Sequence, residues 1–212
     1  MIKAVVFDLD GTLTNTIGDI ANSMNYALRQ HGLPEHETQA YCRMIGNGVH
    51  KLVERAVAGR DDLHDAVYRT YQAYYSQHAM DTTAPYDGIL DMLAALQERG
   101  LKLAVFSNKP HPDTVKVVAH CLAGVKFDAV RGAMPDVPVK PDPAGAFAVA
   151  ETLGVKPEEF LYLGDMRPDM VCAKNAGMHS VGVTWGFGTA DSLREANAEY
   201  VIDHPAELLN IL

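Results

Sequence analysis

Two aspartates near the start of the chain, Asp8 and Asp10, are the first residues whose type and spacing could do chemistry. They follow an apolar stretch, Ile2 to Phe7, which is typical of a strand buried on both faces of a parallel sheet. Ligands of such sheets bind beyond the carboxyl ends of the strands, and two carboxylates this close repel each other unless a cation or a proton intervenes. The pattern therefore predicts a metal-assisted site with one nucleophile and one acid–base group, and the alternative is a plain Asp-Gly turn.

Two later segments could supply groups that bind an anion. The predicted strand 102–106 ends in Ser107 and Asn108, whose hydroxyl and amide suit hydrogen bonding to phosphate oxygens, with an ordinary helix cap as the alternative. After a short predicted strand at 127–130, Lys140 lies between two prolines. Proline restricts its own backbone and that of the residue before it, so this loop is expected to hold one cation in a fixed place. The alternative is a solvated loop lysine.

A further predicted strand, 160–163, is followed by two more carboxylates, Asp165 and Asp169. Together with Asp8 they would form an oxygen-rich pocket, and Mg²⁺ usually takes one or two carboxylates plus a substrate phosphate. Asp169 could also be favoured simply by the dipole of a helix N-terminus, and the two roles are compatible.

The elements that must position these residues change character along the chain. Residues 16–83 have helical periodicity and no convincing strand, whereas strands and helices alternate from residue 84 onward. This predicts an α/β fold, a doubly wound parallel sheet formed by residues 1–15 and 84–212, with a small helical unit, 16–83, inserted after the first strand. The expected helices are 17–30, 49–57, 63–77, 89–98, 112–121, 144–153, 170–176 and 205–212, and the two remaining strands are 180–184 and 200–202.

Four tyrosines, Tyr68, Tyr71, Tyr74 and Tyr75, recur with helical spacing in the third of these helices. A stripe of this kind is typical of helix-on-helix packing, and the alternative is a hydroxyl that reaches a substrate.

Composition restricts the partners. The formal net charge is −9 and no run of basic residues occurs, which argues against a nucleic-acid partner. An anionic ligand would then need locally placed cations. Three widely spaced cysteines, Cys42, Cys121 and Cys172, lack metal-ligand spacing and favour a reduced, cytoplasmic protein. No apolar stretch approaches the ~20 residues of a membrane span, so no membrane partner is expected.

Asp8-Leu9-Asp10-Gly11-Thr12-Leu13 resembles the first motif of the haloacid dehalogenase (HAD) superfamily, most of whose members are phosphatases. The three later polar clusters match its other motifs in order. The resemblance is closest to the phosphoglycolate phosphatase-like group, and it extends to the segments Ile45–Val49, Ser107–Pro110, Lys140–Pro143 and Trp185–Gly188. The chain departs from the family pattern at Asn15-Thr16, where Asp-Ser is frequent, and at Met166, where Ser or Thr is frequent.

The resemblance implies a HAD-like Rossmannoid core with a helical cap and a Mg²⁺-dependent phosphomonoester hydrolase that forms an aspartyl-phosphate. It implies that Asp8 is the nucleophile, that Asp10 is the acid–base group, and that Lys140 offsets negative charge. The implied phosphate-binding residues are Ser107, Asn108, Lys140 and the backbone at Leu9. The implied metal ligands are Asp8, Asp10, Asp165 and Asp169.

The expected substrate is a small phosphorylated metabolite, with 2-phosphoglycolate or a similar small acidic phosphate first. The cap residues expected to hold its non-phosphate end are Arg43, Asn47, Gly48 and Lys51. A sugar-phosphate mutase or pyrophosphatase of the same superfamily is the alternative, and so is a non-catalytic binding module that keeps the fold. A monomer or a homodimer is expected.

Overall fold

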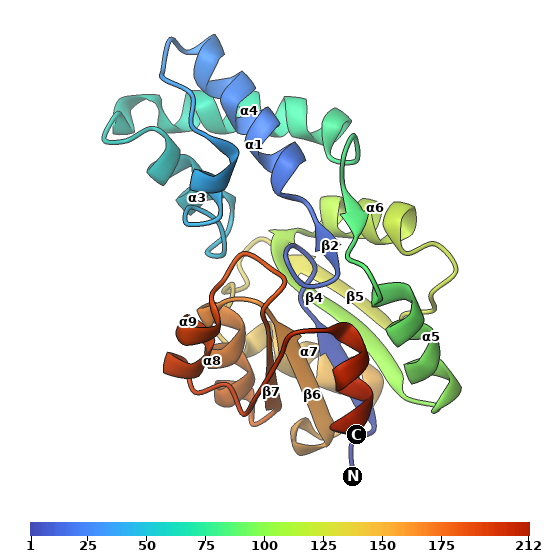
Figure 1. Cartoon of the computed structure of the whole chain (residues 1–212). Helices are drawn as coiled ribbons and strands as arrows, with labels where there is room; N and C mark the ends of the chain where they lie inside the picture. Colours follow the sequence, from blue (N-terminus) through green and yellow to red (C-terminus); the bar gives the residue numbers. More distant parts are fainter.

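The computed structural model describes all 212 residues, and its centre is a six-stranded sheet in the order β5-β4-β1-β6-β7-β8. Every neighbouring pair in this sheet is parallel. Figure 1 shows helices against both of its faces. The predicted doubly wound α/β fold is therefore confirmed. The strands are β1 (Ala4–Phe7), β4 (Lys102–Pro110), β5 (Ala129–Ala133), β6 (Phe160–Gly164), β7 (His179–Val183) and β8 (Tyr200–Ile202).

Alternate side chains of the first strand, β1, pack into the two hydrophobic clusters on opposite faces of the sheet. Successive side chains of a strand point to opposite faces. In β1, Val5 and Phe7 therefore pack with α5 (Ile89–Glu98), α6 (His111–Cys121) and the 3₁₀-helix η3 (Pro205–Asn210). Ala4 and Val6 pack on the other face with α7 (Ala144–Leu153) and α8 (Arg167–Ala176). Because both faces are apolar, the strand is a continuous hydrophobic run. The first polar side chain after it, Asp8, lies at the edge of the sheet.

Some predicted elements differ in extent or type. The terminal segment, expected as an α-helix over 205–212, is the 3₁₀-helix η3. Strand β4 continues through residue 110, four residues beyond its expected end. Helix α9 (Ala190–Glu195), capped by Thr189, and helix α2 (Thr38–Tyr41) were not expected. Both helices are short, with six and four residues, too few for a helical period to show in the sequence.

Residues 16–83 contain helices and no strand. They have a hydrophobic cluster of their own, which includes Met24, Tyr41 and Val53. The chain enters and leaves this segment through a two-stranded antiparallel pair, β2 (Thr14–Asn15) with β3 (Ala84–Pro85). Figure 1 shows the helices gathered beyond one end of the sheet. The helices are α1 (Ile17–Gln30), α2, α3 (Val49–Ala56) and α4 (His64–His78), with a 3₁₀ turn, η1 (Asp61–Leu63).

No helix of the chain is both long enough and apolar enough to cross a lipid bilayer.

Candidate active site

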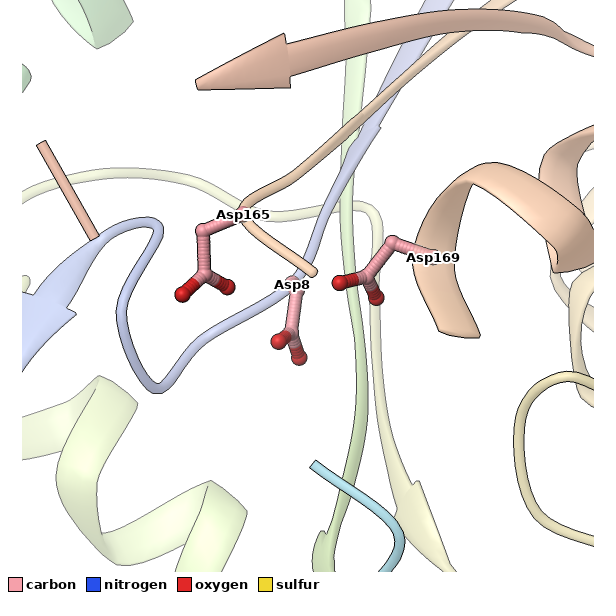
Figure 2. A group of neighbouring side chains, drawn as sticks. All are labelled: Asp8, Asp165 and Asp169. Carbon is pink, nitrogen blue, oxygen red and sulfur yellow. The ribbon is translucent and has the colours of Figure 1, made fainter. Parts of the chain in front are cut away.

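Three carboxylates, Asp8 from the start of the chain and Asp165 and Asp169 from near its end, meet at the carboxyl edge of the sheet. Asp8 follows β1, Asp165 follows the adjacent strand β6, and Asp169 lies in the first turn of α8. Each is buried, and one oxygen of each lies within 4.8 Å of the others. Figure 2 shows the three side chains converging from these separate elements. The strands bring together what the sequence separates by more than 150 residues.

Lys140 is the cation of this cluster. Its Nζ lies 2.7 Å from Asp8 Oδ1 and 2.8 Å from Asp169 Oδ1, and it also donates to the Phe106 carbonyl. The side chain of Lys140 is only 2% exposed. The lysine that the sequence predicts to be held in a fixed place therefore lies directly beside two of the predicted acids.

Asn108 holds the backbone of Lys140. Its amide oxygen accepts from Lys140 N at 2.8 Å, and its amide nitrogen donates to Lys140 O at 3.0 Å. The same nitrogen donates to the carbonyl of Gly46, in the helical segment. These bonds occupy the amide, so the arrangement supports a positioning role for Asn108. Direct phosphate binding by this side chain stays a prediction.

The electrostatics of the cluster favour an additional cation. Burial raises the pKa of Asp8 to about 6, although the ammonium of Lys140 opposes this. Burial, with the charges of Asp169 and Asp8, raises the pKa of Asp165 well above its usual range. For Lys140, burial works against the charged form, but the two carboxylates outweigh it and raise the pKa. One ammonium thus serves three buried carboxylates, and a divalent cation held by oxygen ligands would balance the charge.

Asp165 lies in a cradle made by glycines. A Cβ added at Gly11, Gly186 or Gly188 would overlap atoms of Asp165. The backbone N–H of Phe187 donates to Asp165 Oδ2 at 2.8 Å. This explains the glycine-rich loop after β7: its backbone must approach a buried carboxylate closely. The loop was visible in the sequence, but nothing in the sequence indicated that it touches Asp165.

A cavity of about 80 Å³ lies between the sheet edge and the helical segment. This is well below the ~300–1,000 Å³ of pockets for drug-sized ligands, so the site is built for a small molecule. Asp8, Asp10 and Ser107 line it from the sheet side. Ser107 is buried, in agreement with its predicted place beside the acids. Leu9 is buried next to them, and its carbonyl accepts from the amides that turn the chain after Asp10.

Lys109 is a site residue to which the sequence assigned no role. Its Nζ lies 3.0 Å from both carboxylate oxygens of Asp10, and its side chain is 4% exposed. Lys109 lies within the family-like segment Ser107–Pro110, but the sequence predicts that the strand ends at residue 106. The extension of β4 through residue 110 carries Lys109 along the sheet edge to Asp10.

Of the four expected cap residues, the structure brings only Gly48 to the cavity. Arg43 is exposed, and Lys51 is bound at the surface to Glu54. The side chain of Asn47 accepts from Arg55. The residues that the helical segment contributes to the cavity are Ile20, Ile45, Gly46, Gly48, Val49, Leu52, Tyr71, Gln72 and Tyr75.

Met166 joins the helical segment to the sheet. A Cβ at Gly46 would lie 2.8 Å from the sulfur of Met166, so the two residues are in close contact. Met166 also packs against the hydrophobic cluster of the helical segment, as does Phe187. The departure from the family pattern at this position thus places an apolar contact between the sheet edge and the helical segment, beside the bond from Asn108 to Gly46.

Comparison with known proteins agrees with this geometry. The model of the haloacid dehalogenase-like hydrolase family matches residues 5–183. The phosphoglycolate phosphatase of Haemophilus influenzae is 31% identical over 99% of this chain and 98% of its own length. Phosphoglycolate phosphatase 1 of Pseudomonas aeruginosa is 31% identical over 98% of this chain and 78% of its own. The crystal structure of a "predicted phosphoglycolate phosphatase" from Haemophilus somnus superposes with a TM-score of 0.91, at 29% identity, covering 99% of this chain and 97% of that one.

Proposed function

Because this chain belongs to the haloacid dehalogenase-like hydrolase family, we propose that it is a Mg²⁺-dependent phosphomonoester hydrolase that works through an aspartyl-phosphate on Asp8. The prediction that the protein is an enzyme, a phosphatase of this family, is confirmed by the family match and the full-length relatives. This disfavours the non-catalytic binding module. The observation that carries the proposed mechanism is the position of Asp8, a buried carboxylate that lines the cavity with Lys140 Nζ at 2.7 Å.

In this proposal Asp8 attacks phosphorus, and Asp10, two residues on and also lining the cavity, protonates the leaving oxygen. Asp10 then takes a proton from the water that hydrolyses the intermediate. An aspartate nucleophile divides one difficult step into two easier ones. Lys140 offsets the charge of Asp8 and of the phosphoryl group, and Ser107 and the backbone at Leu9 bind phosphate oxygens. Phosphoryl transfer depends mainly on such positioning and charge neutralisation.

The donor set fits a hard divalent cation, since Asp8, Asp165 and Asp169 offer converging carboxylate oxygens. Asp8, Asp165, Asp169 and the backbone carbonyl of Asp10 would hold Mg²⁺. When bound, the ion would neutralise charge on the phosphoryl oxygens.

We also propose that residues 16–83 act as the cap of a core formed by residues 1–15 and 84–212. The β2–β3 pair is the connection at which the two parts would move, and closure would exclude water from the first step. The apolar residues that the segment places over the cavity support this role.

The proposed substrate is 2-phosphoglycolate or a similarly small acidic phosphate, as the names of the relatives and the small cavity suggest. The test is phosphate release from 2-phosphoglycolate beside sugar phosphates, nucleotides and pyrophosphate, each with Mg²⁺ and with a chelator. We expect a Mg²⁺-dependent preference for 2-phosphoglycolate. Preferred release from pyrophosphate, or conversion of a sugar phosphate to its isomer without release, would favour the pyrophosphatase or mutase alternative instead. We expect the enzyme in the cytoplasm, as a monomer or a homodimer.

The metal site makes its own prediction about stability. Mg²⁺ at 100 times its dissociation constant should stabilise the fold by about 2.7 kcal/mol, which is a Tm increase of roughly 5–10 °C for a chain of this size. Asp165→Asn should abolish this increase. The variant should also be more stable than the wild type in chelator, because a buried carboxylate with a raised pKa has been neutralised.

Thermal unfolding with and without Mg²⁺ measures both effects. Asp191→Asn is the matched control, since Asp191 is exposed and should leave the Mg²⁺ response unchanged. A wild-type Tm that does not respond to Mg²⁺ would contradict the metal site.

A further inference from the structure

Two cations, Lys140 and Lys109, line the cavity. They differ in how many donor hydrogens of the ammonium group remain without a partner. Lys140 is shared among Asp8, Asp169 and the Phe106 carbonyl. Lys109 has a single polar partner, Asp10. No arginine or histidine lines the cavity. An ammonium carries three donor hydrogens, so Lys109 is the cation that can still accept an anionic ligand.

Tyr75, whose ring lies beside this lysine, carries a second unused polar group, its hydroxyl. Tyr75 lines the cavity, is 3% exposed, and its hydroxyl oxygen is buried without a hydrogen-bond partner. The centroid of the Tyr75 ring lies 4.8 Å from Lys109 Nζ. Buried hydroxyls in folded proteins are normally paired, so the unpaired hydroxyl of a residue that lines the cavity is a candidate for a ligand contact.

The place of Lys109 indicates which part of a substrate it would meet. In the proposed mechanism Asp10 protonates the leaving oxygen, and Lys109 contacts both carboxylate oxygens of Asp10. A substituent one or two carbons from the leaving oxygen would therefore lie beside Lys109. The phosphoryl group would lie at Asp8 and Lys140 instead.

From these contacts we infer that Lys109 Nζ and the Tyr75 hydroxyl bind a carboxylate on the leaving group, so that the substrate class is the phosphate esters of small hydroxy acids. This inference rests on the proposed function and deepens it. One part of the cavity wall agrees, because Ile20, Ile45 and Leu52 of the helical segment offer no partners for the hydroxyls of a sugar. Polar groups buried against such a wall would be left unpaired.

The test compares 2-phosphoglycolate with ethyl phosphate, which has a methyl group where the acid has its carboxylate. Lys109→Met should lower kcat/KM for 2-phosphoglycolate by roughly 10- to 100-fold more than for ethyl phosphate, mainly through KM, because a charge-assisted hydrogen bond is lost. Tyr75→Phe should act in the same direction by about 10-fold, the effect of one hydrogen bond to a charged acceptor. This variant removes no bond within the protein, so it should fold normally.

Lys116→Met, at an exposed position of α6, is the matched control and should leave both substrates unchanged. Lys51→Met tests the surface lysine first expected to hold the acid. An unchanged ratio between the two substrates in both Lys109→Met and Tyr75→Phe, or a loss of acid preference in Lys51→Met, would overturn the inference while leaving the phosphatase intact. Failure of the wild type to hydrolyse either ester would overturn the proposed function and this inference with it.

Discussion

Asp8→Asn should lower kcat for phosphate release by at least about 10³-fold, since removal of the nucleophile costs this much or more in a hydrolase that works through a covalent intermediate. Asparagine has nearly the shape of aspartate, so the cavity should keep its form. The amide cannot attack phosphorus as a carboxylate does. Burial raises the pKa of Asp8 to about 6, so replacing the carboxylate should leave stability in chelator equal to or above that of the wild type.

Initial-rate kinetics with 2-phosphoglycolate measures the loss, and thermal unfolding in chelator checks the fold. Asp113→Asn is the matched control, because Asp113 lines the same cavity but lies outside the carboxylate cluster. It should reduce the rate far less. A folded Asp8→Asn protein with near wild-type activity would exclude Asp8 as the nucleophile.

Lys140→Met should have the largest effect on stability. Removing one partner of a buried ion pair typically costs about 3–5 kcal/mol, because the remaining charge is left uncompensated. At roughly 2–4 °C per kcal/mol for a chain of this size, Tm should fall by about 6–20 °C. Both Asp8 and Asp169 would lose their nearby ammonium. We expect kcat to fall by about 10²–10³-fold as well, the effect of losing one charge-stabilising group at a reacting centre.

Thermal unfolding and kinetics on the same preparation measure the two losses. Lys3→Met is the control, since Lys3 is 58% exposed and pairs with Glu159 at the surface. Such exposed pairs contribute about 0–1 kcal/mol. If Lys140→Met unfolded at the wild-type temperature, the ion-pair account of the cluster would be wrong.

The sequence predicts much of this site because parallel strands bring their carboxyl ends to one edge. Asp8 and Asp165 each follow an apolar run, so their convergence follows from the fold class once the runs are identified as strands. Lys140 is harder to place from sequence, since its segment has no regular structure. Flanking prolines indicate a rigid loop, but the contacts with Asp8 and Asp169 depend on the path of the whole chain.

Lateral contacts between elements were not predictable. The tyrosine stripe of α4 illustrates this, because helical spacing places all four tyrosines near one face and does not tell which of them contacts which neighbour. Tyr74 stacks on Tyr26 at 3.9 Å, which is the expected helix-on-helix packing. Tyr71 and Tyr75 also belong to the hydrophobic cluster of the helical segment, and in addition they line the cavity. Which tyrosine has which role depends on how α4 is rotated about its axis relative to the sheet edge. This rotation cannot be derived from the helical period of the sequence.

Positive charge did not identify the residues of the helical segment that line the cavity. Arg43 and Lys51 were expected at the substrate because an anionic ligand needs cations, yet both lie at the surface. The cation that reaches the cavity is Lys109, from the core strand β4. The helical segment contributes mainly apolar residues and tyrosines to the cavity wall.

Trapping the intermediate tests the central claim, covalent catalysis at Asp8, most directly. We would use Asp10→Asn with p-nitrophenyl phosphate and Mg²⁺, because this leaving group needs no acid while activation of the hydrolytic water does need the carboxylate. After acid quenching and digestion, mass spectrometry of the peptides should find one phosphoryl group on Asp8, approaching one per enzyme. Phosphate release without a phosphoryl group on Asp8 at any quench time, or with one on another residue, would contradict the mechanism.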